Sequence, residues 1–381
     1  MNSRQRVQAS LAHREPDRVP IDLGGTIVTT LREGVYNKLR AHLGMAGPPV
    51  CGSGPSRKVQ IEPQVADRLD VDTRYIGTMP PRASREEQRA DGYYRNEWGV
   101  EYWIPSADQI AYVPQGAPLA EATRADLAHY DWPDPLDPGR TEGLCRQASS
   151  LREQTDKAIV GNVDKPSIFE LALALRGFES FLADMAQNSR FARALLDKIT
   201  ELQVQRYEQF LDETGACLDV VVFGDDVGMQ HGLLISPATY RRAVKPLHKA
   251  LYDAIRRKTN ARIFYHCCGD CYGLIRDFIE IGVEVLNPIQ VSATNMQTNR
   301  LKREFGKDLC FWGAVDTQDV LPHGDEAAVR TEVRRRIADL AEQGGYVLAP
   351  VHNVLDDVPP ENLVAACEEA RKPRPAAGSD V

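Results

Sequence analysis

The segment Tyr265–Cys271, which reads Tyr-His-Cys-Cys-Gly-Asp-Cys, holds the side chains best suited to chemistry. It follows a strand-like run that ends at Tyr265 and precedes a helix-like run from residue 272 to 281. Residues two apart on a strand point to the same side, so His266 and Cys268 can present an imidazole and a thiol to one point. Both groups are donors that suit zinc. The spacing therefore predicts a metal site.

Other interpretations of the same segment stay open. Free cysteines are often small buried apolar residues, so some of the three can be inert. Cys268 and Cys271 form a C-x-x-C pair, which is also a redox motif. His266 alone could be a hydrogen-bonded core histidine. The sequence does not show whether Cys267 or Cys271 competes as a metal ligand.

The overall composition narrows the classes of function. The chain has 381 residues, of which 43% are hydrophobic and 26% are charged, which indicates a folded protein with a substantial core. Its net charge of −8 argues against a nucleic-acid-binding surface. The start is polar, and no apolar run approaches the roughly 20 residues of a membrane helix. We therefore expect a cytoplasmic protein with reduced thiols and no membrane partner, and a homodimer is compatible with these numbers.

The periodicity of the chain predicts how these residues are positioned. Eight short apolar runs, separated by helix-like segments, begin near residues 19, 71, 158, 218, 262, 283, 309 and 346. Such runs are typical of parallel strands covered by helices, and eight of them favour a (β/α)8 TIM barrel. A doubly wound sheet is the alternative, but no Gly-x-Gly-x-x-Gly follows an early strand.

The same periodicity, with the turn-forming residues between the regular segments, predicts the domain organisation. Residues 1–371 form a single barrel domain, and the Pro- and Trp-rich stretch 80–140 is an insertion in the N-terminal half, with a small hairpin that covers one mouth. A single helix is expected over 167–185 and another over 236–257. The tail 372–381 is expected to be disordered.

Polar residues follow several of the predicted strands, and in a barrel these strand ends meet on the face that carries the active site. Each alone could be a turn cap or a solvated loop residue, but together they favour a functional site. We expect His352 to be the third metal donor beside His266 and Cys268. Asp225, Asp226 and His352 are the candidate catalytic residues, the aspartates as proton acceptors or as residues that orient a ligand. The candidate substrate-binding residues are Asn287, Gln290, Asp316 and Asn353.

Several motifs together resemble the uroporphyrinogen decarboxylase superfamily over nearly the whole chain. They are His13–Ile21, the run Tyr265–Gly269 with Gly282–Gln290, Phe311–Asp316, and Ala349–Asn353 with Pro359–Asn362. The resemblance implies a (β/α)8 barrel.

One branch of that superfamily decarboxylates a porphyrinogen without a cofactor, and this chain departs from its pattern. Its arginine-rich segment is replaced here by residues 23–28, which contain no arginine. Its aspartate is absent from the strand end at 77–80, and its tyrosine is absent from 166–187. Only His352 falls on an active-site position of that branch.

The other branch comprises corrinoid-linked methyltransferases, which hold zinc on His-x-Cys and a distant cysteine. His266 and Cys268 match the first two ligands, and His352 stands in place of the third. The resemblance implies a zinc-dependent methyltransferase that moves a methyl group between a small substrate or thiol and a corrinoid (cobalamin) on a partner protein. The alternatives are uroporphyrinogen decarboxylase (a carboxy-lyase) and a non-catalytic tetrapyrrole or corrinoid binder.

Overall fold

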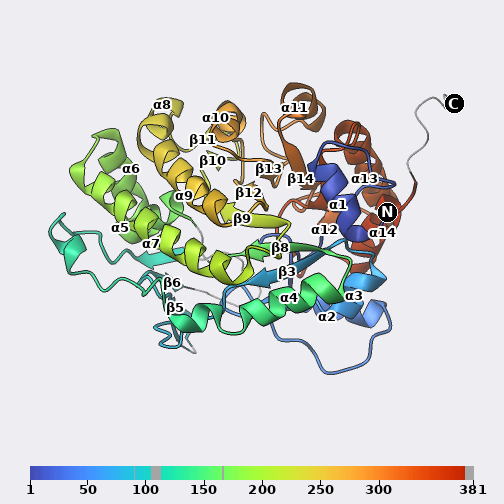
Figure 1. Cartoon of the computed structure of the whole chain (residues 1–381), viewed down its shortest axis with the longest axis horizontal. Helices are drawn as coiled ribbons and strands as arrows, with labels where there is room; N and C mark the ends of the chain where they lie inside the picture. The colour runs from blue at the N-terminus through green and yellow to red at the C-terminus, as the bar shows by residue number, and fades with distance from the viewer. Residues whose placement is uncertain (90, 104–112, 165–166, 374–381) are drawn as a thin grey trace.

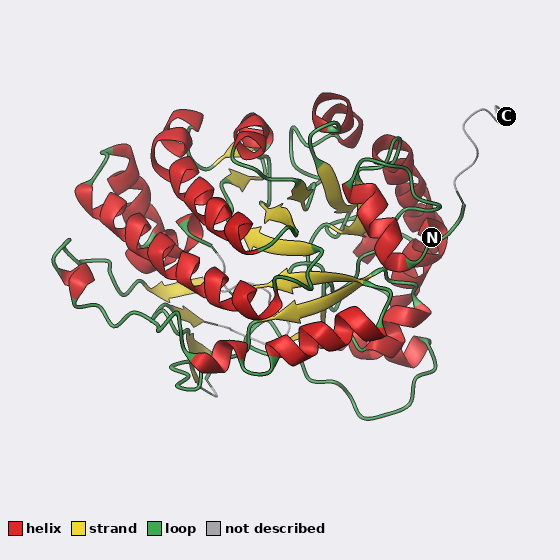
Figure 2. Ribbon diagram, viewed as in Figure 1, coloured by secondary structure: helices red, strands yellow, loops and turns green. Residues whose placement is uncertain are grey.

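The computed structural model describes residues 1–89, 91–103, 113–164 and 167–373. A sheet of seven parallel strands lies at its centre, with helices around it (Figures 1 and 2). The strands run in the order β15 (Tyr346–Pro350), β14 (Cys310–Val315), β13 (Val285–Asn287), β12 (Arg262–His266), β9 (Val220–Gly224), β8 (Ala158–Asn162) and β3 (Thr73–Gly77). This curled sheet is the barrel-like α/β fold that the apolar runs predicted.

The eighth predicted strand, at residues 19–23, is reduced to a single bridge between Ile21 and Leu348. On one side of this segment Leu348 N donates to Pro20 O at 2.9 Å, and Asp22 N donates to Leu348 O at 2.8 Å. On the other side Asp72 N donates to Ile21 O at 2.8 Å. Pro20 has no N–H, so the ladder cannot extend past it, which explains why a regular strand does not form. The segment nevertheless lies between β15 and the residue before β3.

The interior of the sheet is a compact apolar cluster. Alternate residues of each strand point inward, and α1 (Ser3–Leu11) adds Val7 and Leu11 to the same cluster. The strand residues of this cluster are Ala158, Val160, Val220, Val222, Phe264, Val285, Cys310, Trp312, Val347 and Ala349. Residues two positions further along these strands therefore form the next layer, at the carboxyl ends.

Helices connect the strands and cover the sheet. Those that follow the strands are α4 (Leu144–Gln154), α5 (Phe169–Arg176), α6 (Phe178–Ala186), α7 (Arg190–Thr214), α8 (Pro237–Thr239), α9 (Lys245–Lys258), α10 (Ile275–Glu280), α11 (Thr298–Phe305), α12 (Val320–His323), α13 (Glu326–Leu340) and α14 (Pro360–Ala370). In the N-terminal half, α2 (Glu33–His42) and α3 (Pro63–Arg68) precede β3.

Two helix predictions were wrong in detail. The single helix expected over 167–185 is broken at Gly177, whose φ of 92° and ψ of 138° no helix accommodates, giving α5 and α6. The helix expected over 236–257 contains a π-helical turn at Tyr240–Val244 between α8 and α9. Pro246, two residues after the end of this turn, lacks the N–H that an α-helical bond would use.

The predicted insertion contains a four-stranded antiparallel sheet where a hairpin was expected. Its strands are β4 (Glu87–Gln88), β5 (Tyr93–Arg95), β6 (Glu101–Trp103) and β7 (Val113–Gly116). Glu97, in the turn between β5 and β6, forms a buried ion pair of 2.5 Å with Arg140. The insertion leaves the barrel directly after β3, at the carboxyl end of the sheet. That it covers the mouth stays a prediction.

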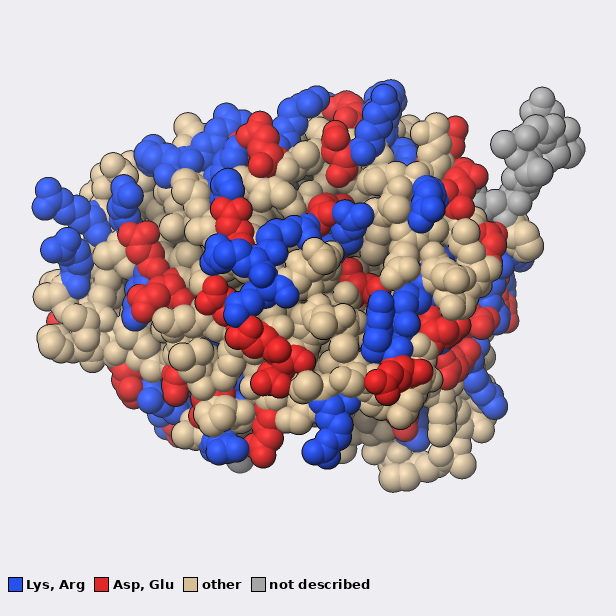
Figure 3. All heavy atoms as spheres, in the orientation of Figure 1, with Lys and Arg blue, Asp and Glu red and all other residues tan. Residues whose placement is uncertain are grey.

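Two further strand pairs lie outside these sheets: β1 (Leu31–Arg32) with β2 (Lys58–Val59), and β10 (Gly228–Met229) with β11 (Gly232–Leu233). On the face shown in Figure 3, acidic and basic side chains are interspersed. No helix in the described part of the chain is both long and apolar enough to cross a membrane. Most of the predicted disordered tail, residues 374–381, lies outside the described residues.

Candidate metal centre

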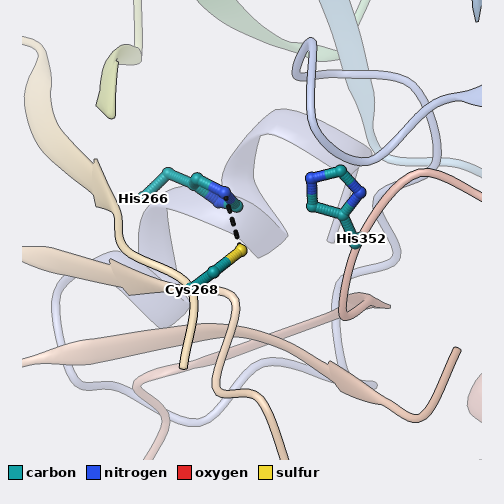
Figure 4. A group of neighbouring side chains, drawn as sticks. All are labelled: His266, Cys268 and His352. Carbon is teal, nitrogen blue, oxygen red and sulfur yellow. Dashed lines mark hydrogen bonds between the residues drawn. The ribbon is translucent and has the colours of Figure 1, made fainter. Parts of the chain in front are cut away.

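The structure brings the side chains of His266, Cys268 and His352 together, as Figure 4 shows. One ligand atom from each lies within 4.8 Å of the other two. His266 is the last residue of β12, Cys268 follows it by two positions, and His352 lies two residues past the end of β15. Cys268 Sγ is 3.3 Å from His266 Nε2, and the two imidazole rings are 5.7 Å apart.

The ring of His266 is fixed by Asn287, the last residue of β13. The Asn287 amide donates to the backbone carbonyl of Trp312 at 2.9 Å, so its Oδ1 must be the atom that faces His266 Nδ1. His266 therefore carries its proton on Nδ1 and leaves the Nε2 lone pair toward Cys268. Metal-binding histidines commonly donate the N–H of the other ring nitrogen to an oxygen in this way. Asn287 thus positions a proposed metal ligand, and its expected role in binding substrate stays a prediction.

His352 is also in the form that a metal requires. Burial, together with neighbouring His266 and Lys58, lowers the pKa of His352 to about 3, so its ring is neutral near pH 7. Within the described residues, neither of its ring nitrogens has a hydrogen-bond partner. A neutral imidazole with free nitrogens that faces another histidine and a thiol is a ready donor.

The loop that carries Cys268 is held from two sides. The Cys268 N–H donates to Asp226 Oδ1 at 2.6 Å, and the Gly269 N–H donates to Gln290 Oε1 at 2.8 Å. Gly269 has a φ of +78°, and a side chain there would collide with the backbone of Met229. Gln290, another residue expected to bind substrate, therefore shapes the cysteine loop.

Two carboxyl groups, those of Asp226 and Glu170, influence the Cys268 thiol through their charge. Glu170, in the first turn of α5, accepts the Asp226 N–H at 3.1 Å. Burial and the carboxyl groups of Asp226 and Asp225 raise the pKa of Glu170 well above its usual range. Burial, then Asp226 and Glu170, likewise raise the pKa of the Cys268 thiol. This electronegative setting favours a bound cation, because a cation would stabilise the thiolate and both carboxylates.

The sequence analysis missed Glu170. It lies within a helical run, where an acidic residue in the first turn is normally read as favourable to the helix dipole. Nothing in the sequence indicates that α5 starts beside the end of β9.

Asp225, predicted to be catalytic, is fully buried and has a different set of contacts from Asp226. Its carboxylate accepts the N–H groups of Ile168, Phe169 and Glu170 at 3.0, 2.7 and 2.8 Å. His248 Nε2 is 2.9 Å from the same carboxylate. Asp225 thus caps the N-terminus of α5 and places Glu170, and these contacts leave little room for proton transfer to a substrate.

The two remaining predicted substrate-binding residues have structural contacts. Asp316, after β14, accepts the Gln318 N–H at 2.8 Å and so caps its own turn. Asn353 accepts the Thr30 N–H at 3.1 Å, while its buried Nδ2 has no partner within the described residues. A substrate-binding role for either stays a prediction.

Cys267 and Cys271 do not belong to the group of three donors and lie fully buried in the main core. Burial and their mutual contact raise the pKa of the Cys267 thiol well above its usual range. The two thiols that meet are thus 267 and 271, and not the C-x-x-C pair 268 and 271.

The donor set fits zinc. Two imidazole nitrogens and one thiolate sulfur suit its borderline softness, and three protein ligands leave a fourth position for a substrate. The three groups come from the carboxyl ends of two strands, which is where barrel enzymes place their active sites.

Comparison with known proteins places the chain among its relatives. A family model described as uroporphyrinogen decarboxylase (URO-D) matches residues 97–373. Among solved structures, a methyltransferase from Methanosarcina mazei is similar, with a TM-score of 0.65 and 19% sequence identity. The similarity covers 97% of this chain and 98% of that one, and at this identity it establishes the fold. No curated protein matches the chain.

Proposed function

The chain belongs to the uroporphyrinogen decarboxylase family, and within that family we propose that it is a zinc-dependent methyltransferase. It would move a methyl group between a small substrate or thiol and a corrinoid carried by a partner protein. The observation that carries the proposal is the convergence of His266, Cys268 and His352 within 4.8 Å. The similarity in fold to a methyltransferase from Methanosarcina mazei supports it.

The proposed roles follow from the contacts. His266 Nε2, Cys268 Sγ and one nitrogen of His352 would hold zinc, which when bound lowers the pKa of an acceptor thiol. Asn287 keeps the lone pair of His266 Nε2 directed at the site. Asp226 positions Cys268 by accepting a hydrogen bond from the Cys268 backbone N–H. Asp226 and Glu170 also offer carboxyl oxygens that could receive the proton that an incoming thiol loses.

Decarboxylation is the second candidate, because the family model carries that name. A porphyrinogen with several carboxylates needs cationic partners, and arginine pairs with carboxylates best. The segment 23–28 contains no arginine. The absence of an arginine there, together with the donor set of His266, Cys268 and His352, favours the methyltransferase.

Metal analysis of the purified protein tests the proposal first. We expect one zinc per chain, lost in His266→Ala, Cys268→Ser and His352→Ala. Matched controls are His42→Ala and Cys145→Ser, both at exposed positions. Full zinc content in all three site variants would contradict the proposed ligand set.

Activity then separates the two reactions. Methylcobalamin is supplied as the methyl donor with a panel of small thiols, and uroporphyrinogen is assayed in parallel for release of carbon dioxide. Zinc-dependent loss of the methyl group from cobalt supports the methyltransferase. Decarboxylation that survives removal of zinc would support the alternative.

A further inference from the structure

Lys58, on β2, is a half-buried lysine that the proposed mechanism does not use. Its Nζ donates to the backbone carbonyl of Ile27 at 3.2 Å. Burial lowers the pKa of Lys58, whereas Asp164 opposes that effect from a distance. Among the ion pairs of the described residues, none includes Lys58. The Asp164 carboxylate therefore offsets only part of the desolvation of this cation.

Backbone contacts place Lys58 at the mouth of the barrel. β2 pairs with β1, and Leu31 of β1 bridges Val354, two residues past His352. Ile27, which binds the Lys58 ammonium, donates its own N–H to Asn162 Oδ1 at 3.1 Å, at the carboxyl end of β8. The charge of Lys58 also contributes to the lowered pKa of His352. Lys58 therefore lies at the side of the mouth formed by β8 and β15.

Tyr75 lies on the same side. On β3 it follows Thr73, whose hydroxyl reaches Asp22 inside the barrel at 2.6 Å, so strand alternation directs Tyr75 inward as well. Its hydroxyl lies over Gly77, only 2.1 Å from where a Cβ on that glycine would be. Gly77 is the register partner of Asn162. In the described part of the chain the Tyr75 hydroxyl has no hydrogen-bond partner.

These two groups have one neighbour in common. Asp164, in the loop after β8, influences the pKa of both Lys58 and Tyr75, and raises each. An ammonium and a free phenol hydroxyl around one loop are both hydrogen-bond donors for an oxygen anion. In the order of the sheet, two strands separate β12, which carries His266, from β3, and two others separate it from β15. Lys58 and Tyr75 therefore lie on a different side of the mouth from His266.

We propose that Lys58 and Tyr75 form a subsite that binds a carboxylate group of the substrate, while its reacting end lies at His266, Cys268 and His352. This inference rests on the proposed function and adds the chemical class of the substrate, a small organic carboxylate. The ammonium forms a charge-assisted hydrogen bond to the carboxylate, and the phenol donates a second one. Asp164 is itself an anion, so the Lys58 ammonium must supply the positive charge that makes a second carboxylate favourable at this place.

Calorimetric titration of the zinc-loaded protein with two matched thiols tests the subsite. The probes are 3-mercaptopropionate and the neutral 3-mercapto-1-propanol. We expect the wild type to bind the carboxylate about 10- to 100-fold more tightly, as a hydrogen bond to a charged group implies. Lys58→Met should remove this preference, Lys58→Arg should keep most of it, and Tyr75→Phe should reduce it about fivefold. Lys249→Met, an exposed lysine, is the control.

Titrating the zinc-free protein with the same pair separates this inference from the metal centre. A preference for the carboxylate that remains without zinc and disappears in Lys58→Met supports the subsite even if no zinc function exists. An equal preference in the wild type and Lys58→Met, with or without zinc, overturns the subsite and leaves the metal proposal standing. Retention of the wild-type melting temperature in Lys58→Met, which removes one hydrogen bond to Ile27, verifies that the variant is folded.

Discussion

Asn287 joins two strands through its side chain: its Nδ2 donates to the Trp312 carbonyl on β14, and its Oδ1 faces His266 Nδ1 on β12. The proposed metal ligand is therefore oriented by a residue whose own orientation is set by the barrel backbone. This pair of hydrogen bonds ties the candidate site to the sheet.

Asn287→Leu should weaken zinc binding about 10- to 100-fold, because His266 loses the acceptor that fixes its tautomer. Asn287→Asp keeps an acceptor and should retain most of the affinity. Competition against a chromophoric chelator measures both. Asn295→Leu, which changes an amide outside the donor cluster, is the control. Unchanged affinity in Asn287→Leu would show that His266 is not a ligand through Nε2.

Asp225→Ala should destabilise the fold by about 3–5 kcal/mol, since three backbone N–H groups of α5 and His248 lose their acceptor. Urea unfolding measures the change, and Asp316→Ala, which removes an exposed-turn carboxylate, should cost less than about 1 kcal/mol. An Asp225 variant of normal stability that has lost turnover would restore the catalytic role predicted from sequence.

Cys267→Ser and Cys271→Ser should each keep one zinc per chain, because both thiols lie in the core and outside the donor cluster. Each should lower thermal stability, since a hydroxyl replaces a buried sulfur. Metal content and melting temperature are measured on the same samples. Loss of zinc at unchanged stability would make that cysteine a ligand.

Leu11→Ala should cost about 2–5 kcal/mol, because Leu11 of α1 belongs to the apolar cluster inside the barrel. The matched control is Leu136→Ala, which changes an exposed leucine and should stay within about 0.5 kcal/mol. Chemical denaturation compares the two. Equal effects would mean that α1 does not contribute to the interior.

Asp277 gives a pH-dependent contribution to stability. Burial alone would raise the pKa of Asp277, but hydrogen bonds from Arg241 and Lys245 lower it below the usual value of an aspartate. A lowered carboxyl pKa stabilises the fold above the unfolded pKa of about 3.9, and this stability is lost as the pH falls through the folded value.

The comparison of wild type with Asp277→Asn should therefore show a difference in unfolding free energy that is constant from about pH 6 to 7 and shrinks below about pH 4. High salt should reduce the difference, because Arg241 is largely exposed. Denaturant titrations at several pH values measure it. A difference that grows on acidification would contradict the assigned direction.

The alternation of strands and helices could be predicted because each buried strand is a short apolar run between helical periods. The meeting of His266 with His352 follows once the strands are ordered in a barrel. The capping of α5 by Asp225 could not be predicted, since sequence places a residue at a strand end but not the helix that turns back onto it. Glu170 and Lys58 were missed for the same reason, because the contacts that suggest a role for each are made with residues distant in the chain. A single glycine at position 177 is compatible with a helix in sequence. Only its backbone angles, a φ of 92° and a ψ of 138°, show that the predicted helix over 167–185 is broken there.

The seam between Pro20 and Leu348 joins the first and last segments of the sheet, and His352 lies just past it. During translation the ribosome releases β15 after every other strand, so the ring stays open and the cluster holds two donors until synthesis is nearly complete. Loop closure over so long a separation is slow. If the chain binds zinc as proposed, capture of the ion would belong to the end of biogenesis, because a nascent chain truncated before β15 lacks His352, one of the three proposed ligands.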